Sequence, residues 1–194
     1  YRDGDSIRFY EDMHVDHKRL SHEEAMQAIY IKGRDNARTP VQWDASANAG
    51  FSPEGVTTWI NVNPNYPAIN AEAVLADEDS IFYHYQQLVA LRRGKLKDLM
   101  VYASFAPVDS VQVPHDEDEA VYAYTRTGGA DGSPANESLL VISNFTAKEQ
   151  ERDFAVLAEA RESGARVELV SSNYKDDAGS TLRPYEAKVY HIVR

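Results

Sequence analysis

The hydrophobic pattern changes near residue 98, and this change constrains the fold more than any other feature of the sequence. Upstream, apolar residues recur at helical spacing or follow no period, and the helical segments are 6–18, 22–32, 71–77 and 80–93. Downstream, apolar and polar residues alternate as in half-buried strands, most clearly in 121–126, 139–142, 166–169 and 187–193. The pattern predicts an α+β chain with two domains, residues 1–97 and residues 98–194.

The second domain is expected to be an antiparallel Greek-key β-sandwich, because about seven short strands fit into its length. Turn-forming residues cluster between the alternating runs, at 128–132 and 176–179. In one run Tyr122 and Tyr124 alternate with small residues, which is typical of rings that pack inside a sandwich. A free-standing carbohydrate-binding module would instead present coplanar, exposed rings.

Short-range signals mark the ends of two helices in the first domain. Ser21 followed by Glu24 has the spacing of a capping box, and Gly33 has the position of a helix stop. Ser80 is a candidate N-cap for the helix 80–93. The apolar residues that share one face of that helix are Ile81, Tyr85, Leu88 and Val89.

Composition excludes several classes of partner. The 194 residues include 20 Lys and Arg against 31 Asp and Glu, a formal net charge of −11, so we expect no binding to nucleic acid or to an anionic membrane. No apolar run approaches the ~20 residues that span a bilayer. Zero cysteines exclude disulfides, zinc-thiolate sites and thiol nucleophiles.

The first residues contain neither an initiator Met nor a basic-then-apolar signal pattern. We therefore expect a cytoplasmic protein from which this chain is a C-terminal piece. On this interpretation the N-terminal portion of the longer protein is a partner of the chain.

Most clusters of reactive residue types have a simple structural interpretation. His14, His17 and His22 are closely spaced but lack a further ligand at helical spacing, so they indicate a solvated helix face rather than a metal site. The acidic run 116–119 lacks the Gly and the terminal Glu of a calcium loop. No nucleophile elbow, Ser-His-Asp grouping or phosphate-binding glycine loop occurs. We expect no metal and no cofactor.

The irregular stretch 34–70 is different, because it is long, aromatic and rich in amides. Its first part reads Arg34-Asp35-Asn36-Ala37-Arg38-Thr39-Pro40-Val41-Gln42-Trp43-Asp44. Forked donors, amides and an aromatic face are what a sugar site needs. The same residues also suit an Arg–Asp network that pins a long loop, and the residues alone leave both interpretations open.

The segment 34–44 resembles the oligo-1,6-glucosidase/α-glucosidase group of the α-amylase superfamily of glycoside hydrolases. Further matches in the same order are Asn48-Ala49-Gly50-Phe51, Trp59-Ile60-Asn61-Val62-Asn63-Pro64-Asn65-Tyr66 and Leu182-Arg183-Pro184-Tyr185-Glu186-Ala187. The resemblance covers the whole chain and corresponds to the C-terminal third of such enzymes.

The resemblance implies that residues 1–97 are the end of a catalytic (β/α)8 barrel, namely the loop excursion after its last strand and its last helix. It also implies that the three catalytic carboxylates lie upstream, so that no catalytic residue is expected in this chain and the chain alone is inactive. Arg34 and Arg38 correspond to the family's sugar-site arginines. Arg34 would hold the terminal glucose, and Arg38 would order the same wall.

The resemblance implies a retaining, exo-acting α-glucosidase that hydrolyses α-1,6-linked, or α-1,4-linked, gluco-oligosaccharides. Sucrose isomerases share the same block and transfer glucose instead, so they are one alternative. A non-catalytic carbohydrate-binding β-domain is the other.

Overall fold

A computed structural model describes residues 1–129 and 133–194, and the positions 130–132 of the predicted turn lie outside these ranges. The chain forms two compact units, residues 1–83 and residues 84–194. The domain boundary at residue 97, which the change of hydrophobic pattern predicts, stays a prediction.

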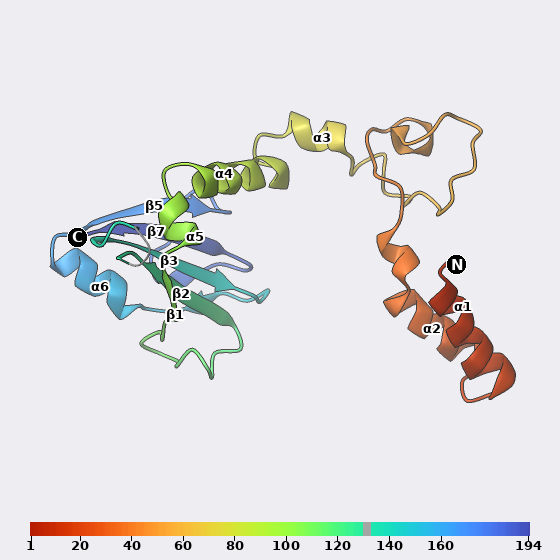
Figure 1. Cartoon of the computed structure of the whole chain (residues 1–194), viewed down its shortest axis with the longest axis horizontal. Coiled ribbons are helices and arrows are strands. Elements are labelled where there is room, and N and C mark those ends of the chain that lie inside the picture. The colour runs from red at the N-terminus through yellow and green to blue at the C-terminus, as the bar shows by residue number, and fades with distance from the viewer. Residues whose placement is uncertain (130–132) are drawn as a thin grey trace. The chain divides into compact units, whose positions relative to one another are not determined.

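Unit 1 is helical and irregular, as predicted. Its elements are α1 (Gly4–Tyr10), a π-helical turn η1 (Glu11–Asp16), α2 (His22–Lys32), the 3-10 turns η2 (Arg34–Ala37) and η3 (Ala47–Gly50), and α3 (Ala71–Ala76) (Figure 1). The capping box of α2 is confirmed, because the Glu24 backbone N–H donates to Ser21 Oγ at 3.2 Å and the Ser21 N–H donates to Glu24 Oε2 at 2.8 Å.

The irregular stretch of unit 1 is held by its own side chains. The Asn48 amide donates to the carbonyl oxygens of Pro53 and Val56, at 3.0 and 2.9 Å. The Gln42 amide donates to Asn65 Oδ1 at 3.0 Å. Gly50 has a φ of +66°, and a Cβ there would lie 2.5 Å from an Asp44 carboxylate oxygen, so a larger residue would be strained and would displace the Asp44 side chain. The stretch is therefore a pinned loop rather than a solvated linker.

The helix α4 (Ile81–Arg93) begins and ends close to its predicted limits, and no residue of it is buried. Its predicted apolar face is largely open, with Ile81, Tyr85 and Val89 all exposed. The predicted cap was wrong, because the Ser80 hydroxyl has no hydrogen-bond partner among the described residues.

Unit 2 is built around one antiparallel sheet. Its remaining elements are α5 (Lys97–Val101), β1 (Ser104–Pro107), β2 (Val121–Thr127), β3 (Glu137–Asn144), β4 (Gln150–Glu151), α6 (Ala155–Glu162), β5 (Arg166–Ser172), β6 (Thr181–Leu182) and β7 (Ala187–Val193). The five-stranded sheet has the order β1-β2-β3-β7-β5, and β4 pairs with β6 separately (Figure 1).

A Greek-key sandwich is not confirmed. On one face of the sheet, Leu140 and Ile192 pack with Phe154 and Leu157, at the start of α6. This helix, which the sequence analysis did not predict, occupies the face where a second large sheet was expected. On the other face, Leu139 packs with Leu96 and Leu99 around α5. The sheet thus lies between α6 on one face and α5 on the other, and apolar side chains pack against both of its faces.

Two strand residues have a burial that their residue types do not predict. Tyr122 is 42% exposed instead of packed, and its ring lies beside Tyr124, with 5.9 Å between ring centroids. Lys188 lies on the core-facing side of β7 and has no exposed surface. Its ammonium Nζ lies 3.1 Å from Asp177 Oδ1 and 3.6 Å from Glu186 Oε1, and it donates to the Gly179 carbonyl at 3.0 Å. The buried charge is therefore compensated.

Candidate functional site

Arg34 is placed by the end of α2. The Gly33 N–H donates to the Ile29 carbonyl at 2.7 Å, and a Cβ on Gly33 would lie 2.6 Å from that same oxygen. A side chain at position 33 would therefore push the chain away from α2. Because glycine ends the helix without such a shift, η2 starts at Arg34 beside the first turn of α1.

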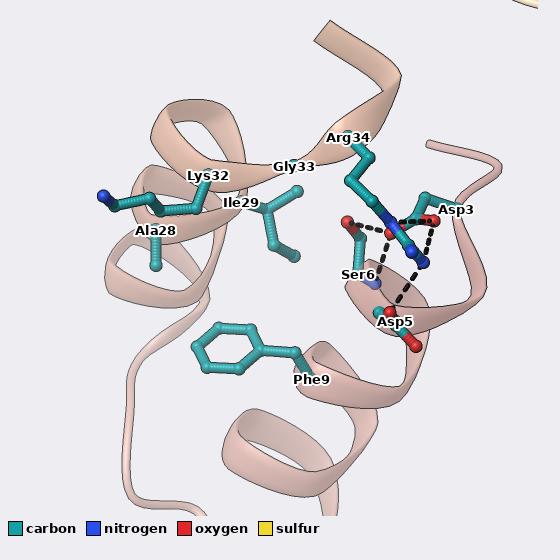
Figure 2. A pocket seen from close by; sticks show the side chains of 9 residues that line it. All are labelled: Asp3, Asp5, Ser6, Phe9, Ala28, Ile29, Lys32, Gly33 and Arg34. Atoms are coloured by element: carbon teal, nitrogen blue, oxygen red, sulfur yellow. Dashed lines mark hydrogen bonds and ion pairs between the residues drawn. The ribbon is translucent and has the colours of Figure 1, made fainter. Parts of the chain in front are cut away.

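Both predicted site arginines reach the same buried carboxyl group, that of Asp3. Arg34 Nε and Nη2 lie 2.9 and 2.6 Å from Asp3 Oδ1, and Arg38 Nη1 lies 3.3 Å from the same atom. Arg34 Nη2 also lies 2.6 Å from Asp5 Oδ2. Figure 2 shows the Arg34 side chain extended over the start of α1 toward both carboxylates. The structure therefore brings Arg34 and Arg38 together through an acid that sequence reasoning did not single out.

Asp3 is only 4% exposed and has a second task as the N-cap of α1, since its Oδ2 accepts hydrogen bonds from the N–H and hydroxyl of Ser6. The hydrogen bonds from Arg34 hold the pKa of Asp3 below its ordinary value, and Asp3 in turn raises the pKa of Arg34. The site is therefore a fixed carboxylate with two cations around it at neutral pH.

Asp35, between the two arginines, is also 4% exposed. Its Oδ2 accepts hydrogen bonds from the backbone N–H groups of Arg2 and Asp3. The Arg2 N–H is the main reason why the pKa of Asp35 is lowered. The second oxygen, Oδ1, has no hydrogen-bond partner among the described residues. The carboxyl thus ties η2 to the residues before α1.

A pocket of about 310 Å³ lies between α1 and α2, beside these ion pairs. Phe9 and Ile29 form its apolar part, and in Figure 2 both side chains point into the space between the helices. Arg34, Asp5 and Lys32 form its polar part, with Lys32 directed away from the ion pairs. The volume is near the lower end for small-molecule sites, and the lining combines apolar area with fixed donors and acceptors.

The histidines that the sequence analysis assigned to a helix face do not form a metal cluster. The Tyr10 hydroxyl and His22 Nδ1 share a hydrogen bond of 2.9 Å. The centroid of the Tyr10 ring lies 5.0 Å from that of the His14 ring. In the part of the chain that the structure describes, no three His, Asp or Glu residues are grouped as metal ligands. None of the helices in that part is long and apolar enough to cross a membrane.

Comparison with known proteins decides the family. The model for the alpha-amylase catalytic domain matches residues 3–102, which include both arginines and their carboxylate partners. The chain belongs to the alpha-amylase family. It is 40% identical over 198 residues to an oligo-1,6-glucosidase of Bacillus cereus, in an alignment that covers 99% of the chain and 31% of that relative.

Solved structures of the family agree in fold. A Bacillus licheniformis trehalose-6-phosphate hydrolase superimposes with a TM-score of 0.82 at 36% identity, covering 100% of this chain and 32% of that one. An isomaltulose synthase from Klebsiella gives a TM-score of 0.77 at 29% identity, covering 99% and 31%. The chain thus spans about a third of the length of the relatives that it matches.

Proposed function

We propose that the chain is the C-terminal third of a retaining, exo-acting α-glucosidase that hydrolyses α-1,6-linked, and alternatively α-1,4-linked, gluco-oligosaccharides. The identity to an oligo-1,6-glucosidase over 99% of the chain supports this assignment. The observation that carries it is the convergence of Arg34 and Arg38 on one buried carboxylate, because this geometry gives a sugar site donors in fixed positions.

In this proposal residues 1–97 are the end of the catalytic (β/α)8 barrel, with α4 as its last helix, and residues 98–194 are the C-terminal β domain. The exposed apolar residues of α4 support the assignment, since a barrel helix buries such a face against its neighbours. Retaining hydrolysis needs two carboxyl groups about 5–5.5 Å apart. We place both, and the acid that assists them, in the part of the enzyme that this chain does not span.

Arg34 and Arg38 are the proposed substrate-binding residues. Asp3 and Asp5 engage Nε and Nη2 of Arg34, and Nη1 has no hydrogen bond among the described residues. Hydroxyl groups of a terminal glucose are acceptors that such a free N–H pair can bind. The ion pairs restrict the guanidinium to one orientation, so less freedom is lost when the sugar binds.

Complementation tests the proposal. The chain is mixed with the part of the Bacillus cereus relative that lies outside the match, and glucose release from isomaltose is measured. We expect no turnover from the chain alone and turnover from the mixture. Turnover by the chain alone at the ~1–10³ s⁻¹ of ordinary enzymes would contradict the proposed location of the catalytic carboxylates.

The products distinguish the alternatives. A sucrose isomerase, which the similarity to the isomaltulose synthase keeps as the second candidate, would convert sucrose to an isomer without net release of glucose. A non-catalytic β-domain would bind oligosaccharide through residues 98–194 and leave isomaltose intact in both samples. The tilt of 43° between Tyr122 and Tyr124 does not match the coplanar rings that such a module presents.

A further inference from the structure

A second and larger cavity lies in unit 1, apart from the Arg34 pocket. It is a groove of about 970 Å³ and shares no lining residue with that pocket. The residues that matter here are Tyr30 from α2, Asp35 and Asn36 from η2, and Trp59 and Asn61 from the pinned loop. Ligand sites of enzymes reach roughly this size.

The groove combines flat aromatic area with unengaged polar groups. The Trp59 side chain is 63% exposed at its wall. Among the described residues, the Asn61 amide has no hydrogen-bond partner, and Asn36 uses only its NH2 group, which donates to the Tyr30 carbonyl at 2.7 Å. Its amide oxygen stays available. Together with the unpaired Oδ1 of the buried Asp35, these groups offer acceptors and donors beside an aromatic face.

The charge of the groove suits a neutral ligand. Among the described side chains that line it, Arg2 and Asp35 are the ones charged at neutral pH, and because their charges are opposite the lining side chains present no net charge for an anion or a cation to match. A pyranose ring has an apolar C–H face and a rim of hydroxyls. Such a ligand pairs its face with an indole ring and its hydroxyls with amides.

We propose that this groove binds a neutral gluco-oligosaccharide of two or three units, with Trp59 as the stacking surface and Asn61 as a hydrogen-bonding group. The proposal rests on the proposed function for the ligand class, and it adds a contact surface separate from the two arginines.

The chain carries only two tryptophans, Trp43 and Trp59, so the fluorescence of each indole can be followed separately in a variant that lacks the other. Trp43 does not line the groove, so Trp43→Phe leaves a single reporter at the proposed site and Trp59→Phe leaves a single reporter outside it. Both variants are titrated with isomaltotriose and followed by indole fluorescence, with glycerol at equal mass concentration as the solvent control.

We expect a saturable change of emission in Trp43→Phe and none in Trp59→Phe. Calorimetry of the 194-residue chain should show at least fivefold weaker isomaltotriose binding for Trp59→Ala and a smaller loss for Asn61→Ala, with unchanged circular dichroism. Asn136→Ala, which removes an exposed amide in unit 2, is the matched control and should bind as before.

No saturable change in Trp43→Phe would overturn the proposal. So would loss of the response when the complementing part of the Bacillus cereus relative is added, because the groove would then be a protein interface. Arg34→Lys separates this proposal from the proposed function. That change should leave the Trp59 titration intact while lowering glucose release by the complemented enzyme.

Discussion

The Arg152 guanidinium meets the Asp118 carboxylate through two parallel contacts, Nε to Oδ2 at 2.7 Å and Nη2 to Oδ1 at 3.1 Å. Both side chains are largely buried, and Asp118 Oδ1 also accepts hydrogen bonds from the backbone N–H groups of Ala120 and Val121. The pair therefore joins the start of β2 to the segment after β4.

Asp118→Ala should lower the free energy of unfolding of unit 2 by about 3 kcal/mol, because it leaves a mostly buried guanidinium and two backbone N–H groups without their acceptor. Urea denaturation followed by circular dichroism measures the loss. The exposed pair Arg166–Glu168 supplies the control, and Arg166→Ala should change stability by less than about 0.5 kcal/mol. Equal losses in the two variants would contradict the structural role of Asp118.

The same carboxyl group predicts a pH dependence. Burial alone would raise the pKa of Asp118, but the hydrogen bonds from Arg152 and from Val121 outweigh it and hold the pKa below its usual 3.8. A depressed pKa stabilises the fold above the unfolded-state value and loses this contribution as pH falls below it. The stability difference between the native chain and Asp118→Asn should therefore be constant from pH 7 to about 5 and shrink below about pH 4. A difference that grows on acidification would contradict this assignment.

Asn144, at the end of β3, is 3% exposed and joins the segment after β3 to the end of β6. Its amide donates to the carbonyl oxygens of Lys148, Leu182 and Arg183, at 2.8, 3.2 and 2.9 Å, and its oxygen accepts from the Thr146 N–H. Asn144→Asp replaces the NH2 donors by a second acceptor, so we expect at least the ~1–3 kcal/mol that an unsatisfied buried group costs. Thermal unfolding measures it, and the exposed Asn136→Asp should shift the midpoint by less than about 2 °C.

Arg34 and Arg38 are tested in the complemented enzyme. Arg34→Lys keeps the charge and loses the fork, so kcat/KM for isomaltose should fall roughly 10–150-fold if Arg34 binds the sugar. Arg38→Lys should cost less, since its contact with Asp3 is longer. If Arg34 only pins the loop, the melting temperature falls while kcat/KM stays within about threefold of the unmodified enzyme.

The sequence predicted the helix and strand positions whose signals come from residues close together in the chain. The capping box at Ser21, the limits of α4 and the strands β2, β3 and β7 all follow from local spacing, and each lies close to its predicted position. Helix α6 was missed because its apolar residues, Phe154, Leu157 and Ala160, give too short a pattern between strands. Its place on the sheet is set by tertiary packing.

The sequence predicted only the part of the candidate site whose residues stand close together in the chain. Arg34 and Arg38 stand four residues apart in a distinctive segment, so the sequence shows them as a pair. Asp3 lies 31 residues before Arg34, and its local pattern indicates only a helix cap. The fold alone shows that one carboxylate caps α1 and binds both arginines. The open cap at Ser80 likewise depends on the geometry of its surroundings and not on its residue type.

Because the ammonium group of Lys188 is fully buried, the chemical reactivity of this lysine reports how often the sheet around β7 opens. An amine without exposed surface cannot react with acylating reagents, and trypsin cannot seat it in a specificity pocket, unless Asp177 and Glu186 first release it. Modification or cleavage at this one lysine therefore counts only those molecules whose sheet has opened. A peptide map taken over time would give the opening equilibrium of unit 2 without any denaturant.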